Sequence, residues 1–293
     1  MQATGTTPEI SRWQKVWQYL IPQHTLSALL LYSTRWQLPI WKNWQIRTFC
    51  RFFQVDLREA IDTDIDNYDC FNDFFTRRLK ADARPLDPDP AHIVSPVDGS
   101  ISACSQLQDM TLIQAKGCDY SLPRLLGGDE ELARQFRNGH YATLYLSPRD
   151  YHRIHIPLDG KLQRSLHIPG RRFAVNPVSV QTIPRLFARN ERLVNIFTTA
   201  IGPMAVIMVG ALCVGSMATI WDQDIKPAGR GNIADHNYSH LDVKLKRGAE
   251  LGHFNIGSTV ILLFPEHTMQ WLMHLRPSQQ VRMGEAIGRI IKR

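Results

Sequence analysis

Three separated segments of this 293-residue chain carry side chains that could act together as a nucleophile, a base and a carboxylate. Ser258 follows Gly257 and leads into a β-branched and leucine-rich run that ends at Phe264. Such a run predicts a buried strand, and a serine entering it after a flexible glycine could attack its own preceding carbonyl. A Gly-Ser-Thr triplet is also common in ordinary turns, so it needs partners before it indicates chemistry.

Those partners could come from two histidines and an aspartate. His152 and His155 lie in a segment bounded by two prolines, which exclude a long helix and favour a loop followed by a short strand. Asp98 precedes a glycine, where an aspartate by default stabilises a turn but could instead orient a histidine. Asp98, His155 and Ser258 would then supply the carboxylate, the base and the nucleophile, although triads are recognised by geometry and not by order.

Metal and nucleotide chemistry receive little support from the sequence. The two histidines could be metal ligands, but no Cys or His cluster elsewhere completes a zinc site at familiar spacing, so we expect no metal. The five cysteines are scattered, odd in number and without a C-x-x-C pair, which favours free thiols in a reducing compartment. There is no glycine-rich phosphate loop and no dinucleotide fingerprint.

Eleven short motifs, spread over nearly the whole chain, strengthen the chemical interpretation. They are Phe71–Leu79, Ser95–Gly99, Gln114–Gly117, Tyr120–Leu122, Leu146–Pro157, Asn176–Pro177, Leu186–Arg192, Gly202–Met204, Val209–Ala211, Val214–Ser216 and Gly257–Thr259. Any one of them is weak, but in this order they closely resemble phosphatidylserine decarboxylase of the bacterial membrane-bound type. That family usually has leucine in the cleavage motif where this chain has Ile256, and we expect processing to survive this change between apolar residues of similar volume.

The resemblance implies a proenzyme that cleaves itself between Gly257 and Ser258. Ser258 would attack the carbonyl of Gly257, with His155 as general base and Asp98 holding the histidine tautomer. Elimination would leave a β chain of residues 1–257 and an α chain of residues 258–293, which remain associated, and Ser258 would become a covalent pyruvoyl group. The resemblance is compatible with a homodimer of such αβ units.

The resemblance further implies decarboxylation of phosphatidylserine to phosphatidylethanolamine. The substrate amine would form a Schiff base with the pyruvoyl carbonyl, which accepts the electrons released as carbon dioxide departs. His152 would then return a proton to the α-carbon. No metal, pyridoxal phosphate or nucleotide would be required.

The formal charge of +7 and the first fifty residues favour a membrane surface as a partner. A basic chain suits nucleic acid or anionic lipid, but no RNA- or DNA-binding signature is present. Residues 10–54 interleave aromatic and basic side chains without any Asp or Glu, on short segments broken by prolines, as interfacial helices do. No run reaches the ~20 apolar residues needed to span a bilayer, and no secretory signal is visible. We expect a peripheral protein on the cytoplasmic face of the bacterial cell membrane.

The overall pattern predicts an α+β protein in two regions. Residues 1–80 would form a helical, membrane-associating region, in which Leu57, Ala60 and Ile61 fall at helical spacing. Residues 81–90 are rich in proline and aspartate and predict a linker. Residues 81–293 would form a mainly antiparallel β catalytic domain, because short apolar runs there are separated by Gly and Pro.

Two features within the β region suggest its internal order. Gly248 and Gly284 stand 36 residues apart in similar turns, each leading into a strand, and these turns resemble the hairpins of barrel-sandwich domains. The uncharged stretch Gly202–Ile220 predicts a pair of buried strands.

Other functions remain compatible with the residues alone. The same triad could belong to a serine hydrolase acting on an external ester or amide, although the Gly-x-Ser-x-Gly elbow is missing around Ser258. A membrane-bound scaffold, or a pyruvoyl enzyme for a soluble amino acid, would not need both the histidines and the aromatic, basic start. Several cationic side chains could contact a substrate phosphate or carboxylate. These are Lys116, Arg149, Arg189, Arg192 and His253.

Overall fold

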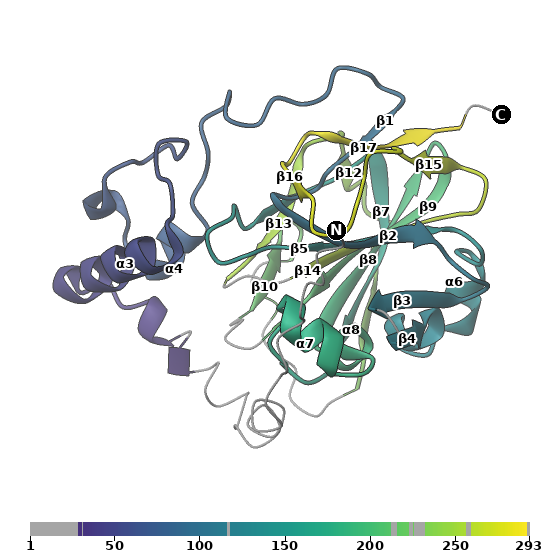
Figure 1. The fold of residues 1–293 in the computed structure, drawn as a ribbon, viewed down its shortest axis with the longest axis horizontal. Coiled ribbons are helices and arrows are strands. Elements are labelled where there is room, and N and C mark those ends of the chain that lie inside the picture. Colours follow the sequence, from purple (N-terminus) through teal and green to yellow (C-terminus); the bar gives the residue numbers. More distant parts are fainter. Residues whose placement is uncertain are drawn as a thin grey trace, which may run out of the picture.

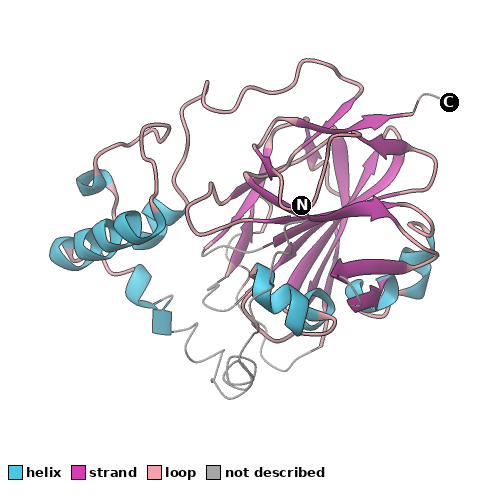
Figure 2. Ribbon diagram, viewed as in Figure 1, coloured by secondary structure: helices cyan, strands magenta, loops and turns pink. Residues whose placement is uncertain are grey.

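A computed structural model describes residues 29–30, 32–115, 118–211, 216–222, 225, 232–255 and 259–291. Gly257 and Ser258, Lys116 and all of the first 28 residues therefore lie outside the described residues. Figure 1 shows helices α3 and α4 to one side of a β-rich body, and Figure 2 shows how strands dominate that body.

The helical region has its own small core. Helix α3 (Pro39–Phe53) begins with a proline in its first turn and ends where Gln54 adopts a left-handed conformation. It is followed by a short 3-10 helix, η1 (Ile65–Asn67), and by α4 (Phe71–Phe75). Ile46 packs against buried aromatic rings from η1 to α4. None of the described helices is long and apolar enough to cross a bilayer.

One prediction in this region is wrong. Leu57, Ala60 and Ile61 do not form a helix, since the chain from Val55 to Asp64 is extended or turning. The reason is tertiary: Ala60 forms an isolated antiparallel bridge with Leu79, so the backbone is drawn into strand-like pairing.

The β-rich region is built from antiparallel strands, as predicted. Within the described residues the main sheet has nine strands in the order β11-β7-β8-β9-β14-β5-β2-β16, with β12 also paired to β7. These strands are β2 (Gly99–Gln106), β5 (His140–Tyr145), β7 (Gly160–Ile168), β8 (Arg192–Thr199), β9 (Gly202–Val209), β11 (Ala234–Asn237), β12 (Lys244–Leu245), β14 (Thr259–Phe264) and β16 (Gln280–Val281).

Three smaller sheets accompany it in the part of the chain that the structure describes. They are β1-β17-β15, β10-β13-β6 and β3-β4. Their strands are β1 (His92–Val94), β3 (Thr111–Ala115), β4 (Cys118–Ser121), β6 (Arg153–His155), β10 (Met217–Thr219), β13 (Glu250–Phe254), β15 (Met269–Trp271) and β17 (Ala286–Ile290). Short helices lie at the rim: α5 (Leu122–Leu125), α6 (Glu130–Arg134), α7 (Pro177–Thr182) and α8 (Leu186–Arg189).

Strand β14 lies in the interior of the main sheet. Thr259 pairs with Tyr145 of β5 on one side and with Val209 of β9 on the other. Every residue from Thr259 to Phe264 is buried, which explains why this segment reads as an unbroken apolar run.

Two of the sequence predictions for the β region are refined by the structure. Gly248 and Gly284 both have positive φ, as tight turns require, and they precede β13 and β17. The stretch Gly202–Ile220 does contain two buried strands, but β9 and β10 belong to different sheets and do not pair with each other. The segment 81–90 is a loop, yet Arg84 and Asp87 make tertiary contacts that tie it to the body.

Replacement of Leu262 in β14 by alanine tests whether the interior strand supports the core. Leu262 is fully buried between Ala142 and Val206, and its truncation leaves a cavity, so we expect a loss of about 2–5 kcal/mol in the free energy of unfolding. Urea unfolding followed by tryptophan fluorescence measures this loss. Met273→Ala, at a fully exposed position, is the control and should change stability by less than about 0.5 kcal/mol. A cost below about 1 kcal/mol for Leu262→Ala would contradict the assignment.

Candidate active site

His155 is held at the end of β6 by three hydrogen bonds. Its backbone N–H donates to the carbonyl of Pro96 (2.8 Å), which brings the segment before Asp98 beside the histidine. Its ring Nδ1 lies 2.7 Å from the carbonyl oxygen of Gly248, and its Nε2 lies 3.0 Å from the hydroxyl of Tyr151. A carbonyl oxygen can only accept, so Nδ1 carries the proton and Nε2 has a lone pair that accepts from Tyr151.

Asp98 is engaged by other groups. Its carboxylate accepts hydrogen bonds from Arg84 Nε (2.8 and 3.0 Å) and Nη2 (2.5 Å), and from the backbone N–H of Met283 (2.9 Å). Within the described chain no hydrogen bond joins Asp98 to His155. The direct contact that we expected is therefore replaced by two others: Gly248 fixes the histidine tautomer, and Arg84 fixes the carboxylate.

The electrostatic setting keeps His155 neutral at pH 7. Burial lowers its pKa below the usual 6.5, while the hydrogen bond to Gly248, the charge of Glu250 and, more weakly, the charge of Asp98 act in the opposite direction. Asp98 therefore acts on His155 by its charge, without a hydrogen bond between the two side chains. A neutral imidazole whose Nε2 lone pair points to a hydroxyl is suited to general-base catalysis.

His152 occupies a drier position. It is fully buried and its ring stacks on Phe75 of α4, with centroids 4.1 Å apart. Burial, with a further contribution from the charge of Arg77, lowers its pKa to about 3. Its Nε2 lies 3.4 Å from the carbonyl of Pro148, while its Nδ1 has no hydrogen-bond partner. His152 is thus a neutral imidazole with an unused lone pair.

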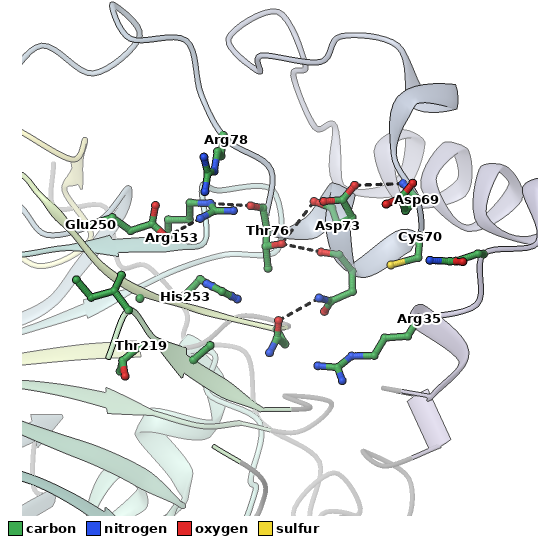
Figure 3. Close-up of a pocket in the computed structure, with 16 residues that line it drawn as sticks. Arg35, Asp69, Cys70, Asp73, Thr76, Arg78, Arg153, Thr219, Glu250 and His253 are labelled. Atoms are coloured by element: carbon green, nitrogen blue, oxygen red, sulfur yellow. Dashed lines mark hydrogen bonds and ion pairs between the residues drawn. The ribbon is translucent and has the colours of Figure 1, made fainter. Parts of the chain in front are cut away.

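A pocket of about 770 Å³ opens between α4 and the β10-β13-β6 sheet; Arg153 lines it, whereas the neighbouring His152 and His155 do not. Figure 3 shows Arg78, Arg153, Thr76 and Asp73 along one side of it and His253 within it. Asn72 Nδ2 donates to Asn255 Oδ1 across the pocket (3.0 Å), which joins α4 to the end of β13. The helical region and the β body therefore build this pocket together.

The predicted cleavage residues, Gly257 and Ser258, lie outside the described residues, but both flanks are described. Asn255 lines the pocket on one flank, and Thr259 begins β14 on the other. Where Thr259 pairs with Tyr145, the buried Oγ1 of Thr259 has no hydrogen-bond partner, whereas the side chain of Ser147 interacts with Asp150. Such an unpaired polar group fits a site that receives a polar group, because isolated buried donors are costly.

The cationic residues proposed as substrate contacts lie in different surroundings in the structure. Arg192 is buried and donates to the carbonyls of Leu125, Asn190 and Arg124, and Arg189 lies over the ring of Phe173. These two arginines stabilise the fold near α8. His253 lines the pocket, Arg149 is exposed near Asp150, and Lys116 lies outside the described residues. Among the described residues, no three His, Cys, Asp or Glu side chains are grouped to hold a metal ion.

Four contributors to the site escaped the sequence interpretation. Tyr151 and Gly248 position His155, Arg84 positions Asp98, and Phe75 covers His152. Tyr151 and Phe75 stand inside the motifs that carried the resemblance, so their positions gave a signal. Arg84 lies in the predicted linker and Gly248 acts through its carbonyl, for which a sequence offers no signal.

Comparison with known proteins gives the same assignment over almost the entire chain. A family model described as phosphatidylserine decarboxylase matches residues 71–289, and one described as PSD matches residues 16–54. A phosphatidylserine decarboxylase proenzyme of Coxiella burnetii (strain Dugway 5J108-111) is 49% identical over 276 residues, covering 94% of this chain and 97% of the relative.

Relatives of the same description occur in other bacteria. That of Azotobacter vinelandii is 47% identical over 274 residues, covering 92% of this chain and 96% of the relative. That of Nitrosococcus oceani is 47% identical over 277 residues, covering 94% and 90%. With a family model over most of the sequence and relatives of this similarity, the chain belongs to the phosphatidylserine decarboxylase family.

Proposed function

We propose that this protein is a self-processing enzyme that decarboxylates phosphatidylserine to phosphatidylethanolamine. The observation that carries the proposal is its membership of the decarboxylase family over nearly its full length, with relatives described as proenzymes. The site adds support, because a buried neutral histidine lies beside the strands that flank the proposed cleavage point. A serine hydrolase finds no support among these relatives.

Self-cleavage begins with attack of Ser258 Oγ on the carbonyl carbon of Gly257. His155 takes the hydroxyl proton on Nε2, either directly or through Tyr151, whose hydroxyl already contacts that nitrogen. The amide becomes an ester as the C–N bond breaks and the serine nitrogen is protonated. Loss of the α-proton then expels the Gly257 carboxylate, and hydrolysis of the resulting dehydroalanine releases ammonia and leaves the pyruvoyl group.

Asp98 contributes to this step by its charge. Held by Arg84 and Met283, it stabilises the imidazolium that forms on His155 from a fixed position, without contacting the ring. Arg84 also pairs with Glu59, at 2.8 Å, so that the buried charge of Asp98 is shared within a small network.

The described surroundings fit the pyruvoyl group. Once formed, its carbonyl supplies an electron sink for the amine-bearing carbon of the substrate. The unpaired hydroxyl group of Thr259 is available to donate to an oxygen atom at this end of β14. Because His155 is neutral, it carries no positive charge that would repel the substrate amine.

His152 returns the proton after carbon dioxide departs. Its low pKa means that it carries no extra proton in the empty site, but a bound headgroup brings a phosphate and a carboxylate. Negative charge near an imidazole raises its pKa, so substrate binding favours the protonated donor. The free Nδ1 is the atom that gains and gives this proton.

The two chains remain associated because the α chain is woven into the sheets. After cleavage, β14 keeps hydrogen-bonded neighbours on both sides, β5 and β9, which belong to the β chain. Strands β16 and β17 likewise pair with β2 and β1. A 36-residue α chain could not form such a core by itself.

The helical region docks on the membrane surface. On α3, Ile40, Trp44 and Phe52 follow one another at multiples of four residues and remain 89%, 57% and 79% exposed. Arg47 and Arg51 are exposed on the same helix. Large apolar side chains next to cations suit insertion into an anionic interface. We therefore place residues 1–80 as the membrane-associating unit and residues 81–293 as the catalytic unit, on the cytoplasmic face of the cell membrane.

Intact mass spectrometry of the wild type and Ser258→Ala tests self-processing. We expect the wild type to split into residues 1–257 and a smaller chain beginning at position 258 with a blocked, pyruvoyl N-terminus. Ser258→Ala should remain a single uncut chain, because it lacks the hydroxyl nucleophile. A variant that is still cut, or a wild type that stays whole, would exclude cleavage through Ser258.

The pH dependence of self-cleavage reports on the base. Because burial lowers the His155 pKa, the ring stays neutral down to a pH below 6.5, and the cleavage rate should fall only as the pH drops further. The measurement is the rate of chain splitting after cell-free synthesis, in buffers from pH 5 to pH 8. Tyr151→Phe removes the hydroxyl at Nε2 and should slow cleavage at every pH. A rate that already halves at pH 7 or above would count against a buried neutral base.

Flotation with anionic vesicles tests the membrane surface. The double variant Ile40→Glu/Phe52→Glu removes two exposed apolar side chains and adds negative charge, so binding should fall at least about tenfold. The control is Met273→Glu, which changes a fully exposed apolar residue in the catalytic half. Equal binding by all three proteins would mean that α3 does not face the bilayer.

A further inference from the structure

Three arginines meet at the turn that follows α4. Arg77, Arg78 and Arg153 line a small cavity of about 180 Å³. This cavity shares Thr76 and two of the arginines with the larger pocket, so the two spaces adjoin. Figure 3 shows Arg78 and Arg153 at the end of the larger pocket, next to Thr76.

Arg153 is already neutralised. Its Nη1 donates to Glu250 Oε1 (2.5 Å) and its Nε donates to the carbonyl of Thr76 (2.8 Å). These contacts tie β6 to β13 and to the end of α4. Arg153 therefore shapes the wall of the cavity but offers no spare charge.

Arg77 is a buried cation with unused donors. Its side chain is among the buried residues, at 5% exposure, and its Nη2 donates to the carbonyls of Arg149 (3.0 Å) and Asp150 (3.3 Å). Its Nε and Nη1 have no acceptor. Burying a guanidinium without a carboxylate partner is costly, so an anion bound in this cavity would offset that cost.

Arg78 is exposed at the junction of the two spaces. Across the part of the chain that the structure describes, no hydrogen bond or ion pair engages its guanidinium. The two aspartates on the cavity wall accept hydrogen bonds from other groups: Asp73 from the N–H of Asp69, and Asp62 from the side chain of Asn67. Neither is paired with Arg77 or Arg78.

We propose that Arg77 and Arg78 form the binding subsite for the phosphodiester of the lipid headgroup. Arg78 contacts the phosphate oxygens from the mouth of the cavity, and Arg77 adds positive charge from its wall. An arginine fork suits phosphate oxygens well. This assignment rests on the proposed function, because it takes the decarboxylase substrate as the ligand.

The position of the subsite distinguishes the phosphate from the carboxylate of the same headgroup. The carboxylate is lost as carbon dioxide, so it must lie at the reacting centre next to β14. The phosphodiester links the serine to the glycerol and lies on the bilayer side of the headgroup. Arg77 and Arg78 come after Thr76, the C-cap of α4, and α4 packs against α3, the helix with the exposed apolar face. The subsite is therefore on the membrane side of the pocket.

Steady-state kinetics of the full-length, processed protein with soluble dihexanoyl phosphatidylserine test the subsite. Arg78→Gln should raise KM about 10- to 100-fold, as expected for loss of a charge-assisted contact, and change kcat less than about threefold. The KM of Arg78→Lys should lie between those of the wild type and Arg78→Gln. Arg77→Lys should also raise KM. The matched control is Arg58→Gln, which changes another exposed cation, one that is paired with Asp56, and should stay within about twofold of wild type.

Calorimetric titration gives a readout that does not depend on activity. Glycerophosphoserine should bind the wild type at least about tenfold more tightly than Arg78→Gln, while free serine should bind both equally weakly. Similar binding of glycerophosphoserine to wild type and Arg78→Gln would overturn the proposal. Inorganic phosphate is the third ligand: if it binds and glycerophosphoserine does not, the site serves free phosphate and the headgroup assignment is wrong.

The outcomes also separate this subsite from the proposed function. If the wild type neither splits nor decarboxylates, but Arg78→Gln still loses glycerophosphoserine binding, the anion site stands and the proposed activity fails. If the wild type is active and Arg78→Gln leaves KM unchanged, the activity stands and the subsite is wrong. The Arg78 variant is the one to use in both cases because Arg78 is exposed, so that its substitution leaves the fold intact. Arg77→Lys instead alters a buried position.

Discussion

The placement of β14 between β5 and β9 is the constraint on which the rest of the site depends. A strand paired on both sides cannot shift along its neighbours without breaking two ladders of hydrogen bonds, so Thr259 has a fixed position opposite Tyr145 and Val209. The residue before Thr259 is therefore attached to a strand that is held rigidly on both sides. The same pairing explains how a short C-terminal segment stays in place after the chain is cut.

The second constraint is that residues of both hydrophobic cores, that of the helical region and that of the β body, surround the pocket. Phe75 stacks on His152, Asn72 bonds to Asn255, and the carbonyl of Thr76 accepts from Arg153. All three contacts join the end of the helical region to the β body. A movement of α3 and α4 at a lipid surface would thus reach the pocket directly, which gives a physical reason for a lipid enzyme to build its site at this boundary.

Electrostatics in the site follow from which charges are buried and which are shared. The carboxylate of Asp98 accepts hydrogen bonds from Arg84 and from a backbone N–H, and Arg84 also forms an ion pair with Glu59. Desolvation lowers the pKa of both histidines: at His155 it outweighs the nearby carboxylates, and at His152 the charge of Arg77 acts in the same direction as burial. Neutral imidazoles next to a fixed carboxylate form a site that can take up a proton in one step and deliver it in another.

Much of this protein could be predicted from its sequence because the informative signals are local. The apolar run after Ser258 predicted a buried strand, the prolines around His155 predicted a loop and a short strand, and the order of motifs indicated the family. The tertiary structure alone decided which groups meet. Arg84 rather than His155 holds Asp98, Gly248 fixes the histidine tautomer, and the Leu57–Ile61 segment pairs instead of coiling. These outcomes depend on contacts between residues distant in sequence, and hydrogen-bond partners chosen by packing leave no periodic trace in the chain.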